Sequence, residues 1–64
     1  MIRFEDLKIG DRVTYRNFGG QFVTGNIIDL DPDIKRGQSG FDLDNGRWGY
    51  THQIVSIHEK AEDA

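Results

Sequence analysis

Residues 40–50 read Gly-Phe-Asp-Leu-Asp-Asn-Gly-Arg-Trp-Gly-Tyr, and they contain the strongest hairpin signal in the chain. Asn45-Gly46 separates two short runs in which apolar and polar residues alternate. A two-residue turn between twisted strands needs a positive φ at both central positions, and Asn followed by Gly adopts that conformation most readily. The stretch therefore predicts a two-residue hairpin at the centre of a small β-barrel.

Alternation of side chains along a strand assigns faces to the aromatic residues of this hairpin. Phe41 and Leu43 share one face before the turn, and Trp48 and Tyr50 share one face after it. Two such rings are large for a small core, since each buries about 150–250 Å². Both can be core residues, or a kink at Gly49 can turn one of them outward.

Two further strands are expected before the hairpin. Residues 12–16 alternate cleanly and predict a half-buried strand with Val13 and Tyr15 on the inner side. Asn17-Phe18-Gly19-Gly20 then predicts a loop with Phe18 near its tip. An aromatic side chain at such a tip needs either the barrel or a partner to cover it.

The strand expected over residues 21–30 does not keep one parity, because Ile27 and Ile28 are adjacent in the chain. A bulge or sharp bend near Gly25 resolves the conflict and places Ile27 and Leu30 in the core, with the side of Ile28 left open. Asp31-Pro32-Asp33 is expected to end the strand. Residues 31–40 are then predicted to form a mobile loop of about ten residues.

The two ends of the chain complete the predicted barrel. Residues 1–9 are expected to pack across one end of it through Ile2, Phe4, Leu7 and Ile9. The spacing Ile54-x-x-Ile57 predicts one tight helical turn leading into a short closing strand, with both isoleucines inward. The sequence thus predicts a single domain over residues 1–64, ordered from about residue 2 to 58, with an acidic tail at 59–64. Its fold class is all-β: a small, five-stranded, partly open barrel with one short helical turn before the last strand.

Charge and composition restrict the class of partner. Eight Lys and Arg oppose eleven Asp and Glu, for a net charge of −3, and part of the acidic excess lies in the tail. A protein that binds nucleic acid through phosphates usually has a strongly basic face. The candidates for a local basic strip are Arg12, Arg16, Lys35, Arg36 and Arg47. The absence of Cys is compatible with a reducing compartment, and no apolar run approaches the roughly 20 residues of a membrane span, so we expect a cytoplasmic protein that does not enter the membrane.

Four short motifs together carry a resemblance to a known architecture. They are Leu7-x-x-Gly10-Asp11-x-Val13, Gly25-x-Ile27, Phe41-x-Leu43-Asp44-Asn45-Gly46 and Ile54-x-x-Ile57. The set resembles the small Src-homology-3-like barrels of the KOW and Tudor type. That resemblance implies the architecture and leaves the function open, because such barrels host nucleic-acid binding, methyl-ligand binding, protein docking and occasional catalysis. A Tudor-like aromatic cage would have only Tyr15, Phe18, Trp48 and Tyr50 to use, and KOW-like modules are usually more basic than this chain.

The plasmid-borne type II dihydrofolate reductases are similar in length and share a Gly-Asp-Arg-Val start. Their pore is lined by a Val-Gln-Ile-Tyr stretch, whereas residues 46–50 of this chain read Gly-Arg-Trp-Gly-Tyr. Both the glutamine and the isoleucine are missing, so this activity is a remote alternative.

The acidic and histidine residues predict neither a metal site nor catalysis. Asp29-x-Asp31-x-Asp33 opens like a calcium-binding loop, but the sixth position is Ile34 instead of Gly and the twelfth is Gly40 instead of Glu. His52 and His58 are the only histidines and would need other ligands to hold zinc. No Ser-His-Asp or paired-carboxylate spacing indicates catalysis. We therefore expect a protein that is not an enzyme and uses no cofactor.

The remaining function classes are modes of binding. Aromatic and Arg side chains anchor many protein interfaces, and the sequence predicts such a patch from Phe18, Arg47, Trp48, Tyr50 and Tyr15. The leading expectation is a protein partner, and the open edges of the barrel favour a homodimer. The alternative is nucleic-acid binding through the five basic residues, with the same rings stacking on bases. A third reading, an acidic inhibitor of a larger machine, rests on net charge alone.

Overall fold

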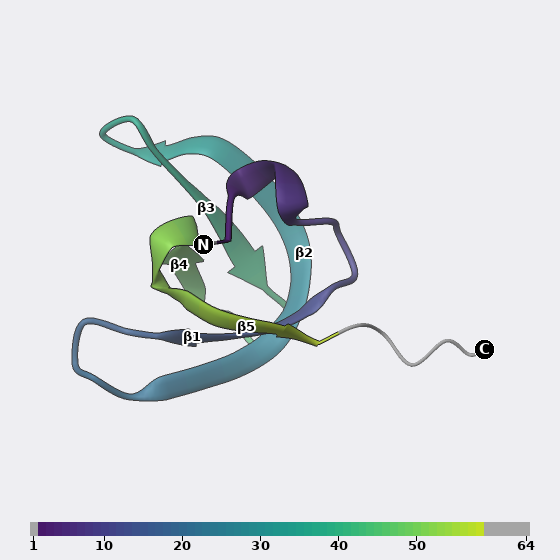
Figure 1. Ribbon diagram of the computed structural model, residues 1–64, viewed down its shortest axis with the longest axis vertical. Coiled ribbons are helices and arrows are strands. Elements are labelled where there is room, and N and C mark those ends of the chain that lie inside the picture. Colours follow the sequence, from purple (N-terminus) through teal and green to yellow (C-terminus); the bar gives the residue numbers. More distant parts are fainter. Residues whose placement is uncertain (1, 59–64) are drawn as a thin grey trace.

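Five antiparallel strands form one sheet in the computed structural model, which describes residues 2–58 (Figure 1). The strands are β1 (Arg12–Arg16), β2 (Phe22–Lys35), β3 (Gln38–Leu43), β4 (Trp48–Tyr50) and β5 (Ile54–His58). Their order in the sheet is β4-β3-β2-β1-β5, and two single 3-10 turns, η1 (Phe4–Asp6) and η2 (Thr51–Gln53), complete the fold. The predicted fold class, an all-β, five-stranded, partly open barrel, is confirmed. The predicted acidic tail at 59–64 lies outside the described residues.

The long strand β2 bends the sheet and connects its two halves. Its first part pairs with β1 from Phe22 to Asn26, and its second part pairs with β3 from Ile27 onward. One extra residue, Ile28, lies between the pairs Ile27–Leu43 and Asp29–Asp42, so the bulge falls three residues after the predicted position at Gly25. Ile28 is consequently exposed, whereas Ile27 is buried and Leu30 packs against the core.

The predicted mobile loop at residues 31–40 is wrong. β2 continues to Lys35, which pairs with Gln38 at the start of β3, and the two strands form a hairpin. Arg36 and Gly37 connect them with φ values of 51° and 77°, the double positive φ of a primed two-residue turn. The acidic residues that resemble a strand end fit within β2 because the pairing with β3 is irregular between Asp31 and Lys35.

The turn at Asn45-Gly46 differs from the predicted two-residue form. Only Gly46 has a positive φ, at 83°, and its N–H donates to the carbonyl of Leu43. The connection is therefore a three-residue turn, Asp44-Asn45-Gly46, with Gly in the left-handed position. Asn45 instead uses its amide group, which donates to the Thr24 carbonyl at 3.1 Å.

A second tertiary contact holds the same turn against β2. The side-chain amide of Asn26 donates to the Asp44 carboxylate at 2.9 Å, and the Asn26 backbone N–H donates to it at 3.2 Å. Both hydrogen bonds lower the pKa of Asp44, and the bond from the side-chain amide of Asn26 has the larger effect. The polar residues of the turn thus connect distant parts of the sheet.

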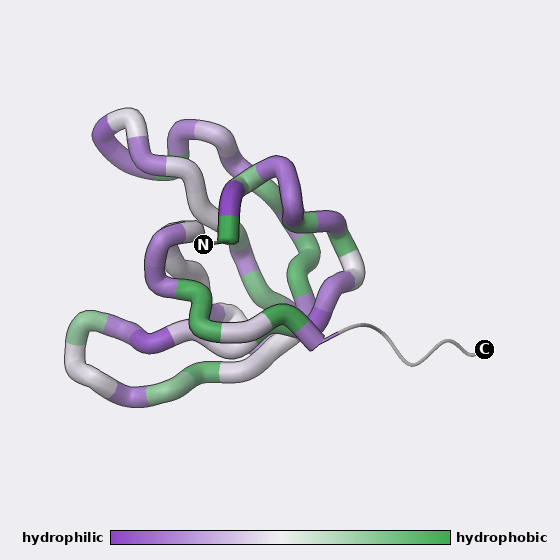
Figure 2. Tube along the Cα trace, viewed as in Figure 1, coloured by the Kyte–Doolittle hydropathy of each residue, from purple (hydrophilic) through white to green (hydrophobic). Residues whose placement is uncertain are grey.

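The core collects inward-facing side chains from almost every element. Its buried members are Leu7, Val13, Tyr15, Ile27, Phe41, Leu43 and Ile54. Ile2, Phe4 and Ile57 pack against this cluster, whereas Ile9 is exposed, contrary to the predicted lead-in. Figure 2 shows hydrophobic residues along β2 and β5 and a hydrophilic tip of the β2–β3 hairpin. The core therefore supports β4 from its inner face, where Tyr15 and Phe41 lie against Gly49.

The short helical turn before β5 lies earlier than predicted. η2 occupies Thr51–Gln53, and the Ile54-x-x-Ile57 segment is strand. The turn is held by the Gln53 side chain, which accepts a hydrogen bond from the Tyr50 backbone N–H at 2.9 Å. Within residues 2–58, no helix has the length and apolar character needed to cross a membrane.

Candidate functional site

The outer face of β4 carries two large aromatic side chains because its inner face has no room for one. Gly49 is buried, and a Cβ atom there would lie 2.9 Å from Tyr15 Cε2 and 3.1 Å from Phe41 Cζ. Alternation then places Trp48 and Tyr50 on the opposite, outer side of the strand. The structure thus answers the open question about these rings: neither belongs to the buried core, and Trp48 is 40% exposed.

Four rings form what we call the outer aromatic cluster. Tyr50 lies at its centre, edge-to-face with Trp48 at a centroid distance of 5.4 Å and with Phe18 at 5.9 Å. His52 stacks on Tyr50 at 5.5 Å, with 13° between the ring planes. Phe18 comes from the β1–β2 hairpin, whose tip projects on the same side of the molecule as β4 and η2 (Figure 1). Phe18 is 80% exposed, so its ring depends on Tyr50 for cover.

Charged side chains border the cluster. The Lys35 ammonium lies 5.2 Å from the centre of the Trp48 ring, within the range of a cation–π contact. Arg47 precedes Trp48 in the chain and is exposed, and Asp42 is the residue paired with Trp48 on β3. A cation, Lys35, and a carboxylate, Asp42, therefore both lie next to Trp48.

Tyr15, predicted to belong to the binding patch, is a core residue and only 2% exposed. Its ring meets Phe41 edge-to-face at 5.4 Å, and its hydroxyl donates to the Trp48 carbonyl at 2.9 Å. Burial raises the pKa of this hydroxyl, and the positive charge of Arg47 opposes part of that shift. Tyr15 thus supports β4 from inside.

The five predicted basic residues do not form one strip. Lys35 borders the outer aromatic cluster, Arg47 precedes Trp48 in the chain, and Arg36 lies at the tip of the β2–β3 hairpin. The guanidinium of Arg16 lies near Gly20 in the β1–β2 turn, and the charge of Arg12 acts on Asp44. Arg12 therefore has an acidic neighbour, and the basic residues are distributed over several parts of the surface.

An open cleft that sequence reasoning missed adjoins the cluster. It measures about 600 Å³ and lies between η1, η2 and the start of β3; η1 is the purple turn and η2 the green turn in Figure 1. Its lining residues are Ile2, Arg3, Phe4, Glu5, Gln38, Ser39, Thr51, His52 and Ile54. His52 belongs both to this lining and to the outer aromatic cluster, so the two features form one continuous surface.

The candidate metal ligands of the sequence are used locally. Asp31 accepts a hydrogen bond from the Asp33 N–H, and Asp33 accepts one from the Gly37 N–H. His58 Nε2 lies 3.0 Å from the Thr14 hydroxyl on the outer face of β1. Within the part of the chain that the structure describes, no three His, Asp or Glu side chains are grouped so as to hold a metal ion.

The sequence matches no known protein family, and neither a curated protein nor a solved structure shows significant similarity to it.

Proposed function

We propose that this protein is a non-catalytic binding module that docks a protein partner through the outer aromatic cluster, with Lys35 and Arg47 at its margin. The observation that carries the proposal is the placement of four contacting rings outside the core, with Phe18 80% exposed. Tyr, Trp and Arg are the residues that dominate the binding energy of protein interfaces. The resemblance of the sequence to Src-homology-3-like barrels supports the same class of function.

The support beneath the cluster favours binding by a rigid surface. Trp48 and Tyr50 project from a strand whose backbone is fixed by the Tyr15 hydroxyl and by the close packing of Gly49. Rings held in this way lose little conformational freedom when a partner covers them. We therefore expect the cluster to bind without rearrangement of β4.

Local charge favours a protein partner over nucleic acid. Lys35 is a cation beside the Trp48 ring, Arg47 is exposed and precedes Trp48 in the chain, and Asp42 contributes a carboxylate next to Trp48. A surface of mixed sign repels phosphates at some points and attracts them at others, whereas protein surfaces offer charges of both signs.

The test is capture of the native partner from host extract by the tagged wild-type chain and by matched variants. Phe18→Ala and Arg47→Ala should each weaken capture at least about tenfold, equivalent to about 1.4 kcal/mol, with a nearly unchanged thermal midpoint. Phe22→Ala is the control, because Phe22 is also exposed, at 67%, and flanks the same hairpin turn outside the cluster. Equal capture by Phe18→Ala and wild type would refute docking through the cluster.

The second candidate, nucleic-acid binding, is favoured by one observation: the Lys35 ammonium lies over the Trp48 ring, and such a ring could stack on unpaired bases. Titration of single-stranded and duplex nucleic acid at low and moderate salt separates the two functions. Binding that weakens steeply with salt would support this candidate, and its absence would remove it.

A further inference from the structure

The cleft between η1 and η2 contains a buried hydroxyl whose hydrogen is available to a ligand. Thr51 is 6% exposed, and its Oγ1 accepts a hydrogen bond from the Ser39 hydroxyl at 2.9 Å. A hydroxyl can donate one hydrogen bond as well as accept. Among the described residues, none accepts a hydrogen bond from Thr51 Oγ1, and the residue lines the cleft. The cleft therefore contains one hydroxyl donor that no described residue uses.

Apolar side chains form part of the wall of this cleft. Ile2 and Phe4 line the cleft from the N-terminal segment, and Ile54 lines it from the start of β5. Their side chains also belong to the core or pack against it, which fixes the shape of the wall. A volume of about 600 Å³ is within the range of small ligand sites and suits one large apolar side chain with its flanking peptide groups.

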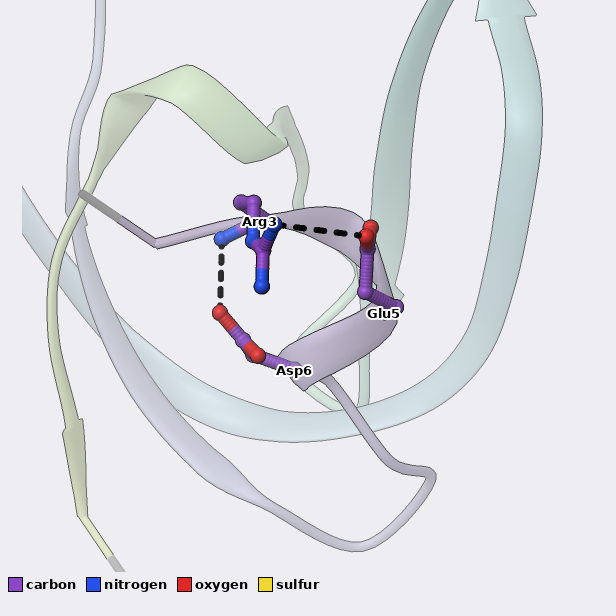
Figure 3. Close-up of polar contacts among 3 residues, drawn as sticks. All are labelled: Arg3, Glu5 and Asp6. Carbon is purple, nitrogen blue, oxygen red and sulfur yellow. Dashed lines mark hydrogen bonds and ion pairs between the residues drawn. The ribbon is translucent and has the colours of Figure 1, made fainter.

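The charges at the rim compensate one another. Arg3 Nη1 lies 3.9 Å from Glu5 Oε2, and the Arg3 backbone N–H donates to Asp6 at 2.9 Å (Figure 3). Both side chains of the ion pair are well exposed. Among the described residues, the one positive and one negative side chain of the lining leave the rim without net charge to attract an ionised ligand, so a neutral ligand fits the cleft best.

We propose that this cleft binds an apolar side chain of the partner together with the neighbouring backbone carbonyl, which accepts a hydrogen bond from Thr51. A peptide segment supplies both features, an apolar body and a neutral acceptor, within one residue. His52 continues the surface from the cleft to Tyr50, so a segment that crosses the outer aromatic cluster reaches the cleft directly. This inference rests on the proposed docking of a protein partner and specifies the chemistry of its anchoring residue.

The direct test is a titration of the ¹⁵N-labelled wild-type chain with N-acetyl-phenylalaninamide, followed by amide chemical shifts. Binding at about millimolar affinity is the expected range for so small a fragment. Shifts should concentrate at Ser39, Thr51 and Ile54, and Thr14 and Thr24 on the outer face of β1 and β2 serve as the internal control. Absence of saturable shifts around the cleft overturns the inference and requires no variant.

Three variants then test the donor. Thr51→Val removes the hydroxyl but keeps a similar side-chain volume, and it should lower the affinity for the probe about fivefold. Thr51→Ser keeps the hydroxyl and should bind the probe with wild-type affinity. Ser39→Ala removes the donor to Thr51 but keeps the Thr51 hydroxyl, so it should also retain binding. Wild-type affinity in a folded Thr51→Val chain would overturn the assignment.

Two further arms identify the class of ligand. Phenylacetate offers a similar ring with a charged acceptor, and tighter binding of phenylacetate than of the neutral amide would overturn the inference of a neutral peptide group. Phe18→Ala should bind the probe normally, because Phe18 does not line the cleft. If Phe18→Ala loses partner capture and the wild-type chain does not bind the probe, only the proposal that the cleft binds a partner side chain is refuted. Normal capture by Phe18→Ala would refute the docking proposal and, with it, the partner peptide named for the cleft.

Discussion

Two groups of aromatic side chains lie on opposite faces of β4 and use similar contact geometry. Inside, Tyr15 and Phe41 meet edge-to-face at 5.4 Å, and outside, Trp48 and Tyr50 meet edge-to-face at the same distance. The inner pair is almost fully buried, whereas Trp48 is 40% exposed. Ring geometry therefore does not separate a structural aromatic contact from one that is free to bind. The burial of the rings separates the two kinds of contact. It predicts that truncation of a ring lowers the free energy of unfolding more on the inner face than on the outer face.

The largest effect is expected at the centre of the inner pair. Phe41 is fully buried, so Phe41→Ala should lower the free energy of unfolding by about 3–5 kcal/mol through lost burial and a new cavity. For a domain of this size that is most of the available stability. Urea denaturation followed by circular dichroism measures it, and Phe41→Leu provides a milder variant if the alanine variant is unfolded in water. A cost below about 1 kcal/mol would contradict the assignment of this ring to the core.

The next effect tests why the two faces of β4 differ. Gly49→Ala places a methyl group against Tyr15 and Phe41 at distances near 3 Å, and should lower the free energy of unfolding by about 1–3 kcal/mol through overpacking. Gly19→Ala is the matched control, because its Cβ would meet only the Asn17 side chain, at 3.4 Å, and its φ is not positive. Equal denaturation midpoints for the two variants would mean that the inner face of β4 can accept a side chain.

A smaller effect is expected from the hydroxyl that connects the inner pair to β4. Tyr15→Phe keeps the ring but removes the hydrogen bond to the Trp48 carbonyl, at a cost of about 1 kcal/mol. Burial raises the pKa of Tyr15, so its hydroxyl stabilises the fold fully below the usual tyrosine pKa, and this stabilisation is lost as pH rises through the raised value. Urea titrations at alkaline pH should therefore show less loss of stability in Tyr15→Phe than in wild type. The same alkaline loss in both chains would contradict this role of Tyr15.

Period-two patterns predicted the inner group well. The sequence places Phe41 and Leu43 on one face and Val13 on the inner side of a strand over 12–16, and all three are buried in the structure. A half-buried strand has to alternate, so local sequence is sufficient for such residues. The turns were less predictable, because the amide of Asn45 is used for a contact with Thr24, twenty-one positions earlier, and a positive φ falls on Arg36, a residue type that does not favour it.

The candidate site was predicted only in part. Phe18 was expected near an exposed loop tip, and the structure places it there with Tyr50 as its neighbour. Tyr15 was assigned to the surface patch although its alternation with Val13 already indicated the core. The cleft could not be found from sequence, because it forms between residues 2–5 and 51–54, and no local pattern reports that approach. His52 lies next to Thr51 in the same turn, and its contact with Tyr50 depends on the η2 geometry.

The smallest effect on stability is expected on the outer face, and it decides whether the two faces differ in kind. Phe18 and Phe22 flank the same hairpin turn and are 80% and 67% exposed, but only Phe18 belongs to the outer aromatic cluster. Substitution of exposed side chains usually changes the free energy of unfolding by no more than about 0.5 kcal/mol, and we expect this for both alanine variants. An edge-to-face contact between two rings adds about 0.5–1.5 kcal/mol beyond the area it buries, so the difference between the two variants isolates the contact of Phe18 with Tyr50. Parallel urea titrations measure this difference directly.

If Phe18→Ala costs more than about 1 kcal/mol beyond Phe22→Ala, the outer rings hold the β1–β2 hairpin against β4 and serve the fold as the inner pair does. If the two variants agree, the contact of Phe18 with Tyr50 adds nothing measurable to stability, and the ring of Phe18 remains available to a partner.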